Sequence, residues 1–487
     1  MPYRAYSRSQ DWLLPPSLDG LLPGDHAARF VAALVDELDL QELRIRAVPA
    51  AIGAPAYNPH LLLSCWLYGF MSRVRSSRKL EQACRENIPF MWLTGMQQPD
   101  HVTLWRFYKK NRRGMKELFK YTVRLSVEVG LVSFALQAID GSKVPVASAD
   151  ALKDAQAIGE LLRGVEAEIA ALEQENRGEG QRGSEQRLRV SKGELKERIV
   201  QAMRQLKPGA GEGQEGMTEV PAGSRARRDL ACVTDPEARL MKGSHGYGTC
   251  YNAQAMVDSA HQVIVAAGVI NEQSDSHAFV PLLEQAQDNT GRAAEATLAD
   301  SGYFSGENLQ YAAAHTNLLM PDPQLKRRAG HPEKWPFHKS HFRYDPTHDV
   351  YLCPEGKPLV YSHTTVGRRN DPLRVYRCHQ CANCPVRNDC TSDACGRAIK
   401  MTGHEPLVLA HREKMRTVQA RELIGRRKCI IEPVFGIIKE QMDTRRFLLR
   451  GLANVRAEWN LLCAAFNMRK LYQHWRRQRL MAAGTGS

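Results

Sequence analysis

Three acidic residues lie in sequence contexts that could bind a metal ion. Asp140 and Asp300 each follow an apolar run that predicts a strand, and each precedes a glycine turn, in AIDGSK and LADSGYF. Strand ends beside glycine turns place side chains in a crevice at the edge of a sheet, where ligands usually bind. A buried carboxylate is costly unless a cation pairs with it. Either aspartate alone is explained equally well as a turn cap, so a metal site needs a third acid.

Glu432 is the candidate for that third acid, within RRKCIIEPVFGIIKEQ. Ile431 and the apolar residues that follow it have the spacing of a buried helical stripe. The position of Pro433 predicts that Glu432 lies near the helix start, because proline is tolerated in the first turn. Lys439 follows seven residues later, about two turns on, so it is expected to share a face with Glu432. The helix dipole explains an acid at a helix start equally well.

Cysteines form a second cluster with metal-ligand spacing. Half of the twelve lie within residues 353–395. Pairs two residues apart, joined by a longer loop, are typical of structural Zn²⁺ in a tetrahedral site. Reduced free thiols are the alternative. A tetrahedral zinc site has four ligands, and six cysteines are candidates for them: Cys353, Cys378, Cys381, Cys384, Cys390 and Cys395.

Strands are predicted only in the middle of the chain, which indicates one mixed α/β core with helical flanks. A helix is expected at 276–287, and helices again from Glu413 to the C-terminus. Residues 322–400 read as irregular. The expected strands are 134–148, 251–257, 262–269, 296–300 and 317–321.

The region from His26 to about Leu131 has a helical pattern. Ser77 is expected to cap a helix at 78–86, and Asp100 to cap a second helix that carries basic residues. Such a pair could dock on DNA as a helix-turn-helix, or form a bundle with a solvated basic face. Charged segments between 150 and 206 predict an inserted helical hairpin, and the Gly/Glu-rich stretch 207–228 a flexible linker.

Composition favours a nucleic-acid partner. The formal net charge is +14, and residues 426–479 hold 13 Lys and Arg against 4 Asp and Glu. This balance suggests a polyanionic ligand. The start has no apolar leader and no run approaches the ~18 apolar residues of a membrane span. We therefore expect a cytoplasmic protein that associates with the nucleoid when it is bound to DNA.

These motifs, in their order, resemble bacterial insertion-sequence transposases of the DDE class. The resemblance rests on DGSK at Asp140, LADSGYFS at Asp300 and the EPVFGIIK helix. The segment RSSRKLEQACRENIPFMWLTGMQQPDHVTLWRFYKKNR is also similar to the helical domain that precedes the core in one branch. The resemblance implies an α/β fold. This fold has an RNase H-like mixed-sheet catalytic core, a helical N-terminal domain, an inserted helical hairpin and a zinc-knuckle-like cysteine-rich insertion.

The resemblance also implies roles for individual residues. Asp140, Asp300 and Glu432 would be the catalytic triad that binds Mg²⁺ or Mn²⁺. Relatives carry Tyr-x2-Arg-x3-Glu-x6-Lys on the third-acid helix, whereas this chain has Lys428 in the Arg place and Gly425 in the Tyr place. Some relatives have an acid or histidine near the triad at the position of His277. The similar cysteine arrangement favours Cys353, Cys381, Cys384 and Cys390 as structural zinc ligands. DNA contacts are expected from Arg106, Lys109, Lys110, Lys143, Arg427, Lys428 and Lys439.

The expected domains follow from these assignments. Residues 1–131 are expected to form a helical N-terminal DNA-binding domain. The first part of the core is expected at 132–150 and 230–321, interrupted by the inserted hairpin and linker at 151–229. The cysteine-rich insertion is expected at 322–400, the helical part of the core with Glu432 at 401–475, and a basic tail at 476–487. The function implied is a homodimeric transposase that cleaves and joins DNA at terminal inverted repeats and target sites. The alternatives are a catalytically decayed or domesticated transposase that only binds DNA, and a nuclease that cuts without joining.

Overall fold

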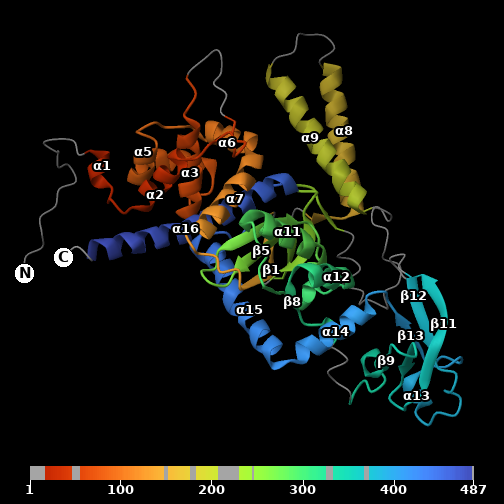
Figure 1. Cartoon of the computed structure of the whole chain (residues 1–487). Coiled ribbons are helices and arrows are strands. Elements are labelled where there is room, and N and C mark those ends of the chain that lie inside the picture. Colours follow the sequence, from red (N-terminus) through yellow and green to blue (C-terminus); the bar gives the residue numbers. More distant parts are fainter. Residues whose placement is uncertain are drawn as a thin grey trace, which may run out of the picture. The chain divides into compact units, whose positions relative to one another are not determined.

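The structure is a computed structural model of the chain. It divides into two compact units, one formed by residues 1–132 and 434–487 and the other by residues 133–433 (Figure 1). No helix in the described part is long and apolar enough to cross a membrane. The linker expected at 207–228 lies outside the described residues. Described are residues 17–46, 55–146, 152–175, 183–206, 230–243, 246–324, 333–366 and 372–484.

The first unit is helical, as predicted. Helix α3 is so apolar that it is buried along most of its length, and α16 packs against α3 and α7. Asp100 caps α6 as expected, since its carboxylate accepts from the Thr103 N–H at 2.6 Å. The cap of α4 is Ser76, so the prediction of Ser77 was wrong by one residue. The helices are α1 (Leu18–Leu21), α2 (Ala27–Asp36), α3 (Pro59–Met71), α4 (Ser77–Glu86), α5 (Ile88–Leu93), α6 (His101–Lys110), α7 (Arg112–Glu128), a π-helical segment (Ile437–Gln441) and α16 (Leu452–Gly484).

A buried ion pair lies inside this unit. Arg75 Nη2 donates to Glu458 Oε1 at 2.7 Å, and both side chains are less than 5% exposed, at 4% and 2%. Glu458 also accepts from the backbone N–H groups of Leu448 and Leu449. These hydrogen bonds satisfy a carboxylate that would otherwise be costly to bury.

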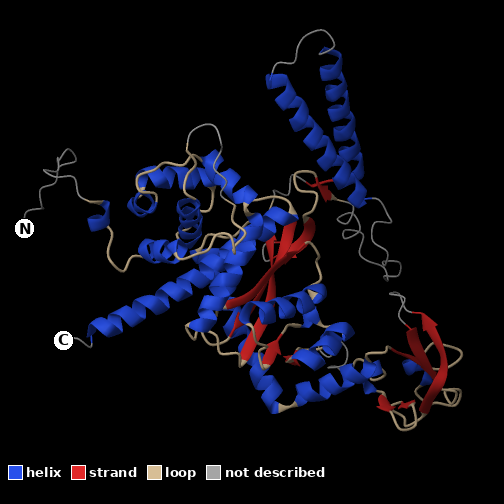
Figure 2. Cartoon of the chain, turned by 45° about the horizontal axis from the view of Figure 1, so that its top comes forward, coloured by secondary structure: helices blue, strands red, loops and turns tan. Residues whose placement is uncertain are grey.

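The second unit is built on a mixed six-stranded sheet (Figure 2). The long strand β5 pairs with β1 on one edge and with both β4 and β6 on the other, always antiparallel. Strands β7 and β8 then continue parallel to β1. The strands predicted at 251–257 and 262–269 and the mixed core are therefore confirmed. The strands are β1 (Leu136–Pro145), β4 (Arg239–Gly243), β5 (Gly246–Asp258), β6 (Ile264–Ile270), β7 (Ala296–Leu298) and β8 (Asn317–Leu319).

Helices cover this sheet. On one side α11 packs against β5 and β6, and Gln285 on α11 accepts from the Ala267 N–H at 3.0 Å. The expected single helix at 276–287 is a 3₁₀ turn (Ser276–Ala278) followed by α11. Strands β5 and β6 are buried along most of their length, on both faces, so the sheet needs helices to cover it. The helices are α11 (Phe279–Thr290), α12 (Gly306–His315), α14 (Glu405–Arg416) and α15 (Val418–Gly436).

The inserted hairpin has a core of its own. Helices α8 (Ala155–Glu175) and α9 (Gly183–Leu206) pack through Ile158, Val165 and Ile199, together with the short strand pair β2 (Leu152–Lys153) and β3 (Ala231–Cys232). This confirms the helical hairpin predicted from the charged segments.

The cysteine-rich region is not irregular, so that prediction was wrong. It forms a five-stranded antiparallel sheet in the order β13-β12-β11-β10-β9. Tyr351, Leu359 and Tyr376 form its core with two of the cysteines. The bounds are β9 (Arg343–Asp345), β10 (Val350–Leu352), β11 (Pro358–Val366), β12 (Pro372–Arg377), the short helix α13 (Arg387–Cys390) and β13 (Ala398–Met401).

Candidate active site

The strand register brings Asp140 and Asp300 together. Strands β1 and β7 are parallel neighbours, with Leu136 opposite Ala296 and Ala138 opposite Leu298. The same offset, carried two residues further, aligns Asp140 with Asp300. Because side chains alternate along a strand and neighbouring strands lie about 4.8 Å apart, both carboxylates belong to the same face of the sheet.

Asp140 is a half-buried carboxylate with a basic partner. Its Oδ2 accepts from Arg427 Nη1 on α15 at 2.9 Å, and its Oδ1 accepts from the Gly141 N–H at 2.8 Å. Burial raises the pKa of Asp140 above its usual value, although Arg427 and the Gly141 N–H oppose this rise and the Asp300 charge adds to it. A carboxylate in this setting favours a cation close by.

Asp300 caps the turn that follows β7. Its Oδ1 accepts from the Gly302 N–H at 2.6 Å, at the start of a 3₁₀ turn (Ser301–Tyr303). The interpretation as a turn cap is therefore confirmed. It does not compete with metal binding, because a carboxylate has two oxygens and several acceptor sites.

The contribution of Glu432 to the site stays a prediction. It is an exposed residue on α15, five positions after Arg427. At 100° per residue the two side chains point about 140° apart around the helix, and it is Arg427 that faces Asp140. The chain thus places the predicted third acid on the helix that contacts Asp140.

Pro433 is not in the first helical turn, so that prediction was wrong. Helix α15 begins at Val418, and Pro433 lies inside it. Proline has no N–H, so the carbonyl of Cys429 loses its usual helical donor. Gln262, in the turn between β5 and β6, donates Nε2 to the carbonyls of Cys429 at 3.1 Å and Ile430 at 3.3 Å. This contact compensates for the proline and ties the helix to the sheet.

The donor set partly fits a divalent cation. Asp140 and Asp300 supply hard oxygen ligands of the kind that Mg²⁺ and Mn²⁺ prefer, and they interact electrostatically. Among the residues that the structure describes, no group of three or more His, Cys, Asp or Glu side chains is arranged so that it could hold a metal ion.

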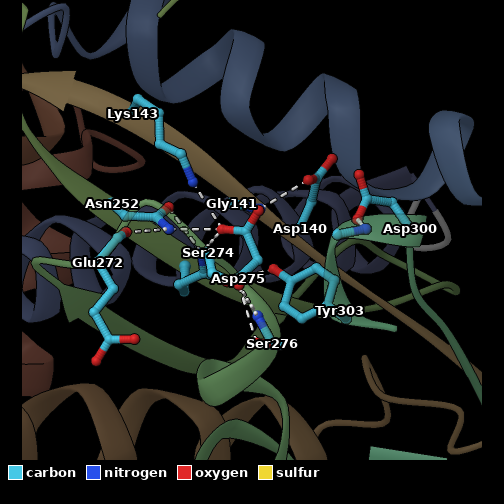
Figure 3. A network of polar contacts seen from close by, with 12 residues as sticks. Asp140, Gly141, Lys143, Asn252, Glu272, Ser274, Asp275, Ser276, Asp300 and Tyr303 are labelled. Carbon is cyan, nitrogen blue, oxygen red and sulfur yellow. Dashed lines mark hydrogen bonds and ion pairs between the residues drawn. The ribbon is translucent and has the colours of Figure 1, made fainter. Parts of the chain in front are cut away.

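The sequence reasoning missed Asp275, which lies behind β1. Its Oδ1 accepts from Lys143, Asn252 and Gln254 (Figure 3). The nearby His277 instead pairs with Glu272 and is 63% exposed. The polar run NEQSDS after β6 was the signal available in the sequence.

Tyr303 links the same network to the turn of Asp300. Its buried hydroxyl donates to Gln254 Oε1. Burial raises the pKa of Tyr303 well above its usual value, and the charges of Asp275, Asp140 and Asp300 raise it further. These shifts indicate that three carboxylates act on one buried hydroxyl.

The basic residues expected to contact DNA fall into two groups. Exposed side chains are Arg106, Lys109 and Lys110 on α6, and Lys428 on α15. Lys143 and Arg427 are 17% and 14% exposed and pair with aspartates. Lys439 lies in the π-helical segment, so the α-helical spacing that predicted a face shared with Glu432 does not continue to it. DNA contact by these seven residues stays a prediction.

The cysteines gather around a small cavity of about 20 Å³. Two of the sulfurs accept backbone hydrogen bonds, Cys353 from the Lys357 N–H at 3.2 Å and Cys381 from the Arg397 N–H at 3.4 Å. Burial raises the pKa of Cys378 to about 11. The cavity is lined by Cys353, Cys378, Cys381, Cys384 and Cys390, whereas Cys395 is exposed.

Two family models match the chain. One described as "Transposase DDE domain" matches residues 352–472, which include Glu432 and the clustered cysteines but neither Asp140 nor Asp300. One described as "Transposase domain (DUF772)" matches residues 16–110. A comparison with curated proteins finds no match. The two family matches confirm the resemblance seen in the sequence and support the assignment of the chain to the insertion-sequence transposases of the DDE class.

Proposed function

We propose that the chain binds the ends of an insertion sequence, cleaves DNA phosphodiester bonds there and joins the freed ends to target DNA. The observation that carries this proposal is the register of β1 and β7, which, continued two residues past the end of β7, aligns Asp300 with Asp140, on the face where α15 brings Arg427 to Asp140. Helix α15 also carries Glu432.

The sheet supports an RNase H-like core. Three antiparallel strands (β6, β5 and β1) are followed by two strands parallel to β1 (β7 and β8). In sequence order these strands read 3-2-1-4-5 across the sheet. Asp140 lies within the first of these strands and Asp300 just after the fourth, and the two acids are proposed to line a ligand-binding crevice at the carboxyl end of β7.

Asp140, Asp300 and Glu432 are the proposed ligands of Mg²⁺ or Mn²⁺. A pair of such ions activates the attacking oxygen and stabilises the leaving oxygen of a phosphodiester. The basic residues of α15, Arg427 and Lys428, are proposed to contact the DNA phosphate, as is Lys439. For Arg427 this requires that the guanidinium leave Asp140, which would free the Oδ2 atom.

DNA binding is proposed to use the exposed basic side of α6. Arg106, Lys109 and Lys110 are exposed, whereas Leu104 and Phe107 on the same helix are buried. Phosphate contacts of this kind make affinity fall steeply with salt. A homodimer that pairs two ends is proposed from the family resemblance.

Structural zinc is a separate proposal. Backbone N–H groups that donate to Cys353 and Cys381 sulfurs are typical partners for thiolates that bind a metal, and the cavity between the cysteines is small enough for one ion. The proposed ligands are Cys353, Cys381, Cys384 and Cys390. We expect about one zinc per chain in freshly purified protein, and less than about half an equivalent would refute the proposal.

A DNA-binding protein without catalysis is the second candidate. One observation favours it: Arg427 Nη1 donates to Asp140 Oδ2 at 2.9 Å, where a metal ion would bind. A joining assay separates the candidates. Labelled duplexes from the DNA that flanks the gene are incubated with the chain in Mg²⁺ or in EDTA. Joined product only with Mg²⁺ supports the transposase, cleavage alone a nuclease, and binding alone the non-catalytic protein.

A further inference from the structure

Asp275 is an aspartate with an unusually complete set of partners. Its Oδ1 accepts from Lys143 Nζ at 2.8 Å, from Asn252 Nδ2 at 2.6 Å and from Gln254 Nε2 at 2.8 Å. Figure 3 shows this carboxylate at the centre, with Lys143 and Asn252 pointing toward it. Its side chain is 21% exposed. A carboxylate held by one ammonium and two amides has little freedom to move.

This carboxylate lies close to two glycines, together with its own partners. A Cβ added to Gly141 would lie 2.2 Å from Gln254 Nε2, 2.9 Å from Asn252 Oδ1 and 3.0 Å from Asp275 Oδ1. A Cβ added to Gly302 would lie 2.9 Å from Asp300 Oδ1 and 3.1 Å from Asp275 Oδ2. Gly141 directly follows Asp140, and Gly302 is the residue whose N–H Asp300 accepts. The Asp275 carboxylate therefore reaches both chain segments that carry the proposed metal ligands.

Hydrogen bonds connect Asp275 to the same two segments. Lys143 lies on β1, three residues after Asp140. Gln254 bonds to Asp275 through its Nε2 and accepts from the Tyr303 hydroxyl through its Oε1, and Tyr303 belongs to the turn that Asp300 caps. The network thus spans from β1 to the turn after β7.

Asp275 approaches from the back of the sheet. Gly141 is opposite Gln254 in the β1–β5 register, and Asp140 is opposite Ala255. Because neighbouring residues of a strand face opposite sides, Gly141 and Asp275 lie on the side away from the Asp140 carboxylate. The charge of Asp275 is balanced by Lys143. Both facts indicate that Asp275 supports the two aspartates and is not a further metal ligand.

We propose that Asp275 is a positioning residue that sets the spacing between Asp140 and Asp300. The inference rests on the proposed function, because the spacing matters only if the two aspartates act together. A metal site tolerates displacements of only about 0.5 Å. Loss of the Asp275 charge would leave Lys143 without its carboxylate and let both glycine segments relax.

The test compares Asp275→Asn with Asp258→Asn. Asp258 is a matched control: it is buried at the C-terminal end of β5, where it accepts from the N–H groups of Ser133, Phe134 and Ala260. It lies three residues along β5 from Ala255, the residue opposite Asp140, and these three donors are not the residues that donate to Asp275. Four quantities are measured on the full chain: joined product, the Mn²⁺ concentration that gives half-maximal joining, affinity for the DNA end, and thermal unfolding.

For Asp275→Asn we expect joining to fall about 10-fold or more and the half-maximal Mn²⁺ concentration to rise about 10-fold, with DNA-end affinity unchanged. For Asp258→Asn we expect lower thermal stability with an unchanged Mn²⁺ requirement. If Asp275→Asn does not fold, Asn252→Ala removes one donor, and a rise of about 3-fold in the Mn²⁺ requirement is expected.

Two results would overturn the inference, and they can be told apart by the joining activity of the wild-type chain. If the wild-type chain joins DNA and Asp275→Asn has the Mn²⁺ requirement of Asp258→Asn, the positioning role is wrong while the function stands. If the wild-type chain joins no DNA in Mg²⁺ or Mn²⁺, the proposed function fails and the inference fails with it.

Discussion

Removing the amide of Gln262 tests how the helix that carries Glu432 is held. Gln262 donates to the carbonyls of Cys429 and Ile430, and Pro433 is the reason that the Cys429 carbonyl lacks a helical donor. Gln262→Met keeps the length of the side chain and removes the donor. We expect α15 to open more often in this variant.

The magnitude follows from the two hydrogen bonds. A typical intramolecular hydrogen bond contributes about 1 kcal/mol net, and a buried acceptor left unpaired costs about 1–3 kcal/mol. The Ile430 carbonyl keeps a helical donor four residues later in Val434, whereas the Cys429 carbonyl has none because Pro433 has no N–H. We therefore expect a loss of about 1 kcal/mol in the free energy of local opening, which corresponds to about 5-fold faster amide exchange.

The assay is hydrogen exchange of peptides from 418–433, compared with peptides from α11 as an internal reference. Pro433→Ala is the matched control, because alanine restores an N–H that can reach the Cys429 carbonyl. In that background Gln262→Met should accelerate exchange by less than about 2-fold. Equal acceleration in the wild-type and Pro433→Ala backgrounds would refute the link between the glutamine and the proline.

Three further predictions test other parts of the structure. Gly302→Ala should reduce joining about 10-fold or more without loss of DNA binding, because the new Cβ would lie 2.9 Å from Asp300 Oδ1; unchanged joining would show that this carboxylate is not constrained there. Glu458→Gln should destabilise the first unit by about 3 kcal/mol in denaturant unfolding, since it leaves the buried Arg75 without its counter-charge, and a loss below about 1 kcal/mol would contradict this. Burial lowers the pKa of His411 despite its bond to the Met320 carbonyl, with Lys414 lowering it further and Asp322 opposing. The unfolded state then binds more protons, so stability from this site is present above pH 6.5 and is lost as pH falls; His411→Gln should show a smaller decrease in melting temperature between pH 7 and pH 5 than the wild type.

The two aspartates could be predicted from sequence because local signals mark them. An apolar run before Asp140 and Asp300 and a glycine soon after each are visible in the sequence itself. The turn predicted after Asp140 was wrong, because β1 continues through Gly141 to Pro145. Their alignment could not be predicted, since it depends on the pairing of β1 with β7, about 160 residues away in the chain. Nothing local to either strand specifies that offset.

Asp275 could not be predicted because its hydrogen-bond partners are distant in the sequence. Gln254, Asn252 and Lys143 lie 21, 23 and 132 residues away in the sequence. A polar run after a strand reads as an ordinary loop, and only the folded sheet brings these side chains together.

Two errors have local causes. The start of α15 was placed too late because Pro433 is a strong signal for a first turn, and the substitute donor, Gln262, is remote in sequence. The sheet of the cysteine-rich region was missed because β11 is mostly exposed and its residues do not alternate between apolar and polar. In both places tertiary contacts outweigh the local pattern.

Strand joining by metal-ligand variants tests the central claim most directly. Wild type, Asp140→Asn, Asp300→Asn and Glu432→Gln are compared on labelled end duplexes at saturating Mg²⁺, with DNA binding as the control for folding. The account predicts Mg²⁺-dependent joining by the wild type and a loss of about 100-fold or more in each variant, with DNA binding retained. Joining by Asp300→Asn at the wild-type level would contradict the assignment of the active site.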